Sequence, residues 1–164
     1  MKNLIIYVHG KGGSAGEAEH YKMFFPNSEV IGFDYRSQTL WEAKKEFLAF
    51  FTAQRSRFEH VTLVANSIGA FFGISSLDET LVDRAYLISP IVDMEKLICD
   101  MMQWSGVTEQ ELALTSIETV SAFAKQHHAD LTVMPGGEHW FHTEEQMQFL
   151  NHWIRECNAK HVCC

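Results

Sequence analysis

Cysteine and proline are scarce in this sequence, and the few cysteines are poorly placed for cross-linking. Four cysteines and three prolines occur among 164 residues. Three of the cysteines are bunched near the C-terminal end instead of being spaced as a disulfide framework. A zinc site built from Cys157, His161, Cys163 and Cys164 would lack the paired C-x-x-C spacing of a zinc knuckle. We therefore expect reduced thiols and no bound metal.

Basic residues and long apolar runs are also scarce. The chain has 13 Lys and Arg against 21 Asp and Glu, a formal net charge of -8, and its basic residues are scattered. Binding to a nucleic-acid backbone needs clustered positive charge, so nucleic acid is excluded as an expected partner. No apolar run reaches the roughly 18 residues of a membrane span, and no signal-like segment precedes His9. We expect a cytoplasmic protein.

The remaining composition is that of an ordinary globular protein. Hydrophobic residues make up 46% and charged residues 21% of the chain, which is close to the average for folded domains. No repeat, low-complexity tract or linker divides the sequence. We expect a single domain over residues 1–164.

Short apolar segments alternate with amphipathic ones along the whole chain. β-Branched and apolar enrichment predicts five strands, at Asn3–Val8, Glu29–Phe33, His60–Val64, Arg84–Ile88 and Asp130–Met134. Helical patterns lie between them, at Thr39–Ala53, Ile68–Ser76, Met94–Trp104 and Ser116–His127, and Thr115 with Glu118 has the spacing of a capping box. Continuous apolar strands that alternate with helices indicate a mostly parallel, open sheet of about five strands with helices on both faces. The predicted fold class is α/β.

Three of the predicted strand ends carry unusual residues. In open α/β sheets, function gathers where strands leave the sheet at its carboxyl edge. The first strand is followed by the residues HGKGGS (9–14), the third by NSIG (66–69), and the last by PGGEHW (135–140).

The third strand end places a serine between small residues. Ser67 has Ala65 two positions before it and Gly69 two positions after it. A serine in a tight strand-to-helix turn takes a strained conformation that lifts its hydroxyl above the sheet, and the crowding demands small flanking residues. A serine that only caps a helix would not need them, and a glycine in the first turn would cost helix stability. We therefore interpret Ser67 as a candidate nucleophile.

With these residues in matching order, the sequence resembles the α/β-hydrolase family across almost its whole length. The segment 65–69 resembles the family's nucleophile elbow, G-x-S-x-G, with Ala65 in place of the first glycine. His9-Gly10 resembles its oxyanion loop and residues 136–141 its terminal histidine turn. The resemblance implies that Ser67 is the nucleophile, that His139 is the general base, and that the N–H groups of Lys11 and Ile68 form the oxyanion hole. It implies an esterase-like serine hydrolase that needs no cofactor and acts on a small acyl compound, with at most a short connector as a lid.

The family's acid is the part of the pattern that this sequence lacks. The carboxylate of such a triad should lie between Ser67 and His139 at a strand end. Between Pro90 and Thr115 the sequence predicts one helix and a polar connector but no strand that could carry it. Two substitutes stay open: Asp93, just beyond the fourth strand, which we favour, and Glu111. Loss of the acid predicts impaired turnover, by about 10⁴-fold in a serine triad.

Two other functions fit parts of the sequence. Gly10, Gly12 and Ala15 match the dinucleotide-binding pattern G-x-G-x-x-G/A after a strand, and Asp34 lies 19 residues beyond Ala15 at the end of the second strand. A non-catalytic binding derivative of the hydrolase fold is the other alternative, and the missing acid favours it. In either hydrolase-like case Met101, Met102 and Trp104 are candidate acyl-chain contacts on the connector.

Overall fold

The structure is a computed structural model, and it describes residues 2–92, 117–139 and 141–160. The chain divides into two compact units, Met1–Pro90 and Ile91–Cys164, and each is described by itself below. The single domain of the sequence analysis stays a prediction. Within the described ranges no helix is both long enough and apolar enough to cross a membrane.

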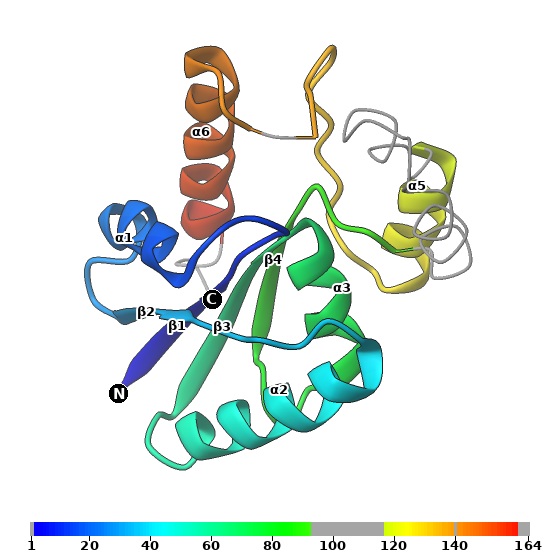
Figure 1. Cartoon of the computed structure of the whole chain (residues 1–164). Helices are drawn as coiled ribbons and strands as arrows, with labels where there is room; N and C mark the ends of the chain where they lie inside the picture. The colour runs from blue at the N-terminus through cyan, green and yellow to red at the C-terminus, as the bar shows by residue number, and fades with distance from the viewer. Residues whose placement is uncertain (1, 93–116, 140, 161–164) are drawn as a thin grey trace. The chain divides into compact units, whose positions relative to one another are not determined.

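The first unit is built on a parallel four-stranded sheet (Figure 1). Its strands are β1 (Asn3–Val8), β2 (Glu29–Phe33), β3 (His60–Asn66) and β4 (Arg84–Ile88). Their order across the sheet is β2-β1-β3-β4, with all neighbours parallel. Three of these strands have the predicted bounds, and β3 runs two residues further, to the residue before Ser67. All carboxyl ends therefore meet at one edge of the sheet.

Both faces of this sheet are covered within the first unit. A Cβ added to Gly32 in β2 would lie 1.9 Å from the carbonyl oxygen of Ala15, in the 3₁₀ turn η1 (Ala15–Glu17). The next residue, Phe33, points the other way and contacts Phe47 and Phe51 of α2 (Leu40–Arg55). Because side chains alternate along a strand, η1 and the short helix α1 (Ala18–Tyr21) cover one face, and α2 covers the opposite face. The predicted two-sided arrangement is confirmed.

The helix α2 matches the predicted helix at 39–53 within two residues at each end. Thr39 caps it by accepting from the Glu42 N–H, and the Glu42 carboxylate accepts from the Thr39 N–H in return, at 3.1 Å. On its inner side Phe47 and Phe51 are fully buried. They pack beside α3 (Ser67–Ser76), whose Phe72 contacts Phe47. These aromatic rings form the buried core of this unit together with the aliphatic residues of β1 and β3.

The second unit contains two helices in its described part. α5 (Ile117–Gln126) matches the predicted helix at 116–127 within one residue at each end. α6 (Glu144–Lys160) was not predicted from the sequence. A local signal existed: Thr143 and Gln146 have capping-box spacing, and Gln146 accepts from the His142 and Thr143 N–H groups at 3.1 and 3.3 Å. The buried positions Gln146, Leu150 and Ile154 follow helical spacing.

The predicted fifth strand is wrong. Residues 130–134 form neither strand nor helix, and the apolar side chains of Leu131 and Val133 are 42% and 52% exposed. Apolar and β-branched enrichment marks a segment that suits a strand, but a strand forms only where another strand pairs with its backbone. The described sheet therefore has four strands instead of about five. The predicted helix at 94–104 and the capping residue Thr115 lie outside the described residues.

Candidate active site

Ser67 sits at a sharp turn between β3 and α3. Its backbone has φ 52°, in the left-handed region, which costs a non-glycine residue roughly 1–2 kcal/mol. Only three described non-glycine residues have positive φ, namely Ser67, Ser89 and His128. A residue is held in such a conformation only where its surroundings force it. The strained serine turn that the sequence predicts is present in the structure.

The small residues around Ser67 are explained by close backbone packing. A Cβ added to Gly69 would lie 2.3 Å from the His9 carbonyl oxygen and 3.0 Å from that of Val8. A Cβ on Gly10 would lie 3.2 Å from the Ser67 Cβ. Ala65 is completely buried. These contacts bring the glycine loop after β1 directly against the serine turn after β3.

The Glu17 carboxylate links the glycine loop to the serine turn. One oxygen of Glu17 accepts from the backbone N–H of Ser14, at the end of the glycine loop, at 2.9 Å. The other oxygen accepts from the Tyr7 hydroxyl at 2.5 Å. Tyr7 is buried, and the Asn66 side chain, next to Ser67, hydrogen-bonds to it in turn. Burial first, and then the bond to Glu17, raise the pKa of Tyr7, so its hydroxyl stays protonated and donates.

Tyr35 holds His9 at the start of the glycine loop. The two rings stack with centroids 4.5 Å apart, and the Tyr35 hydroxyl donates to the His9 carbonyl oxygen at 3.0 Å. Burial, together with the nearby Glu46, raises the pKa of Tyr35 to about 12, which keeps this donor protonated. The Nδ1 atom of His9 lies 2.8 Å from the Gly10 carbonyl oxygen, so it carries the proton. The glycine loop is thus fixed at its start by Tyr35 and at its end by Glu17.

The two predicted oxyanion-hole residues lie on these fixed segments. Lys11 follows Gly10 in the loop, and its side chain is exposed. Ile68 is the second residue of α3, where backbone N–H groups have no partner inside the helix. Both would act through main-chain N–H groups, so their side chains need not point toward a substrate.

His139 lies in the second unit, in a glycine turn that leads toward α6. Gly136 has φ 69°, which favours glycine, and the Gly137 N–H donates to the Met134 carbonyl oxygen at 3.1 Å. The side chain of His142 lies 3.5 Å from a Glu138 oxygen. Burial lowers the pKa of His139 below its ordinary value of 6.5. At neutral pH its imidazole is therefore neutral and able to accept a proton.

Sequence reasoning missed one unusual residue at the same edge of the sheet. Ser89 follows β4, precedes Pro90 and has φ 44°. The last paired residues of β3 and β4 are Asn66 and Ile88, so Ser67 and Ser89 each come one position after this pair. No sequence pattern marks a left-handed serine before a proline, because the residue before proline normally takes an extended conformation.

Several sequence-predicted residues cannot be placed. Asp93 and Glu111, the two candidate acids, lie outside the described residues, as do Met101, Met102 and Trp104. Asp34, of the dinucleotide alternative, follows β2 and is exposed. In the part of the chain that the structure describes, no group of three His, Cys, Asp or Glu side chains is arranged to hold a metal ion.

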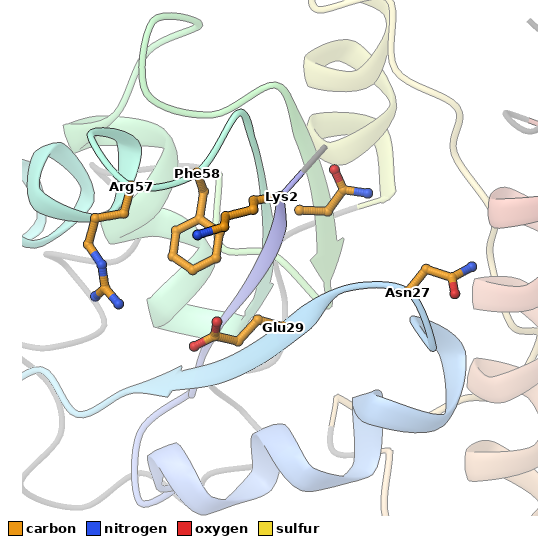
Figure 2. Close-up of a pocket in the computed structure, with 6 residues that line it drawn as sticks. Lys2, Asn27, Glu29, Arg57 and Phe58 are labelled. Carbon is orange, nitrogen blue, oxygen red and sulfur yellow. The ribbon is translucent and has the colours of Figure 1, made fainter.

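A pocket of about 330 Å³ lies at the other end of the sheet (Figure 2). Its lining residues precede or begin strands β1, β2 and β3: Lys2, Asn3, Asn27, Glu29, Arg57 and Phe58. Since all four strands are parallel, this is the amino edge, whereas Ser67 lies at the carboxyl edge. The pocket is therefore separate from the serine turn.

Comparisons with known proteins establish the fold. No protein-family model matches the sequence, and no curated protein matches it significantly. Among solved structures, a carboxylesterase from Mesorhizobium loti is similar, with a TM-score of 0.62, 14% identity, and coverage of 93% of this chain and 88% of that chain. A proline iminopeptidase-related protein from Thermus thermophilus matches with a TM-score of 0.47, 17% identity, and coverage of 96% of this chain and 59% of that one. With its parallel sheet and flanking helices, this chain has the α/β-hydrolase fold.

Proposed function

We propose that this chain is a serine hydrolase that cleaves a carboxylic ester or a related acyl compound through an acyl-enzyme on Ser67. The observation that carries this proposal is the strained backbone of Ser67, φ 52°, at a strand-to-helix turn against which the glycine loop packs. Strain of this kind is retained where function uses it, and it exposes a hydroxyl at the carboxyl edge of the sheet. The fold shared with a carboxylesterase is consistent with this chemistry but does not assign it.

In the proposed reaction Ser67 and His139 act as nucleophile and general base. His139 removes the hydroxyl proton while Ser67 Oγ bonds to the carbonyl carbon, and the resulting oxyanion is stabilised by the Lys11 and Ile68 N–H groups. The bond to the leaving group then breaks as the imidazolium returns the proton to it. Water, activated by the same imidazole, releases the acid from the acyl-enzyme.

The triad acid stays part of the proposal. Asp93 is the favoured candidate and Glu111 the substitute. An acid that hydrogen-bonds to the imidazole fixes its tautomer, and its absence would slow turnover by about 10⁴-fold while leaving acyl-enzyme formation measurable. A slow enzyme is therefore compatible with the proposal.

Covalent labelling tests the proposal directly. We expect a fluorophosphonate to add to Ser67, since the phosphorus takes the place of the carbonyl carbon and fluoride leaves. Digestion and mass spectrometry would locate the adduct, and His139→Ala should slow its formation. A serine of the same helix, Ser76, serves as an internal control that stays unmodified.

The possible labelling results separate the competing functions. An unlabelled protein that binds a nicotinamide dinucleotide would favour the dinucleotide site at Gly10, Gly12 and Ala15. That site has a structural weakness, because the helical segment after the glycines is broken into η1, the four-residue α1 and a second 3₁₀ turn, Lys22–Phe24. No label and no nucleotide binding would favour a non-catalytic binding protein.

The pH dependence of labelling is a second test. Only neutral His139 can accept the Ser67 proton, and burial holds the pKa of His139 below 6.5. We expect the labelling rate to be constant above about pH 7 and to fall as the pH is lowered through a midpoint below 6.5. Folding stability should weaken in the same direction, since the protonated form is disfavoured only in the folded state. A midpoint above 6.5, measured from initial labelling rates, would contradict this assignment.

A further inference from the structure

Ser89 stands beside Ser67 at the carboxyl edge of the sheet. Asn66 and Ile88 are the last pair of β3 and β4, and each serine directly follows its member of that pair. Neighbouring strands are about 4.8 Å apart, so the two chains leave the sheet next to each other. Both residues lie in the first unit.

The position of Ser89 complements that of the glycine loop. The strand order β2-β1-β3-β4 puts β1 on one side of β3 and β4 on the other. Gly10 and Lys11 follow β1, so the proposed oxyanion site lies on that side of Ser67. Ser89 follows β4 on the opposite side. Ser89 therefore borders Ser67 on the side away from the proposed oxyanion site, where one substituent of a bound acyl compound has room to lie.

The backbone of Ser89 is unfavourable in two respects. Its φ of 44° lies in the left-handed region, which disfavours any residue with a Cβ. It also precedes Pro90, and proline disfavours all but extended conformations in the residue before it. Glycine would relieve the first cost. Backbone outliers cluster at functional sites. A serine at a position where glycine would be less strained therefore indicates a role for the serine side chain.

From this placement we propose that Ser89 contacts the substrate of Ser67 through its hydroxyl. The inference rests on the proposed hydrolase function and deepens it by naming a substrate class. The substrate carries a hydrogen-bonding group, such as a hydroxyl, on its alcohol or acyl part, outside the reacting carbonyl. Ser89 binds this group and so sets specificity.

Three small esters test the inference with the full-length protein. Ethyl acetate has no additional hydroxyl, 2-hydroxyethyl acetate carries one on the alcohol, and ethyl glycolate carries one on the acyl part. We expect kcat/KM of the wild type to be about tenfold higher for at least one hydroxylated ester than for ethyl acetate, the size of one hydrogen bond. In Ser89→Ala and Ser89→Gly this ratio, divided by the ratio of the two esters' uncatalysed hydrolysis rates, should fall to about one.

The melting temperature, measured beside the ester preference, separates a role of Ser89 in substrate binding from a purely structural role. Ser89→Gly should raise the melting temperature, because glycine accepts the left-handed backbone, while it loses the preference for hydroxylated esters. His128→Gly is the matched control. His128 has φ 52° in the second unit, so glycine there should also raise the melting temperature but leave the ester preference unchanged.

The outcomes distinguish this inference from the proposed function. A protein labelled at Ser67 that shows no hydroxyl preference, or keeps its preference in Ser89→Ala, overturns the role of Ser89 alone. A protein that carries no label and hydrolyses none of the esters overturns the hydrolase proposal and this inference together. A preference that disappears in both Ser89 variants and persists in His128→Gly supports the inference.

Discussion

Ser67→Ala, His139→Ala and the double variant are each expected to lower ester turnover by the same factor, about 10⁶ where an acid completes the triad and about 10² where none does. A nucleophile and its base act as a unit, so removal of either one leaves only substrate binding and oxyanion stabilisation. The second substitution then has nothing further to remove. Equal losses of turnover in the three variants would show that Ser67 and His139 act as one catalytic pair. Two residues that contribute to turnover independently would give a larger loss in the double variant.

Initial rates on a p-nitrophenyl ester, with each variant checked by circular dichroism, would measure this pattern. Ser76→Ala is a suitable control because Ser76 ends the helix that Ser67 begins. It should retain wild-type turnover. If the losses in the two single variants multiplied in the double variant, Ser67 and His139 would be acting independently and the proposed mechanism would fail.

Gly69→Ala is expected to destabilise the protein by about 3 kcal/mol, the upper part of the range for overpacked cores. The added methyl group would lie 2.3 Å from the His9 carbonyl oxygen, and backbone cannot move aside as a flexible side chain can. For a chain of this length, the melting temperature should fall by roughly 6–12 °C. The displaced glycine loop should also slow the labelling of Ser67.

Gly73→Ala provides the comparison within the same helix. A Cβ on Gly73 would meet only the end of the Leu63 side chain, at 2.9 Å, and alanine is favoured over glycine in a helix by up to about 1 kcal/mol. This variant should therefore remain within about 1 kcal/mol of the wild type in denaturant unfolding. Equal effects of the two substitutions would show that the close approach at Gly69 is not what requires glycine there.

The sequence predicted those features that depend on nearby residues. β1, β2 and β4 were located because continuous β-branched and apolar runs suit buried parallel strands. The strained turn at Ser67 was predicted from a local signal, the small residues Ala65 and Gly69, although the backbone that crowds Gly69, at Val8 and His9, is distant in the chain. The start of α2 was predicted within one residue from the helical pattern that begins at Thr39.

The features that were missed depend on partners distant in the chain. Residues 130–134 have strand-like composition, but composition does not supply a neighbouring strand. Glu17 joins Ser14 to Tyr7 through hydrogen bonds that no sequence motif predicts. The left-handed conformation of Ser89 follows from its surroundings, since its own sequence context, Ser-Pro, favours an extended backbone. The unpredicted helix α6 is different, because its capping signal at Thr143 and Gln146 was local.

The bonds made by Glu17 also restrict how this protein can evolve. A Cβ on Gly13 would lie 2.7 Å from Glu17 Oε1, and that oxygen is already engaged by the Ser14 N–H. A side chain at position 13 would displace this carboxylate, which is the flexible end of Glu17, and so weaken its bonds to Ser14 and Tyr7. The substitutions tolerated at positions 7, 13 and 17 should therefore depend on one another.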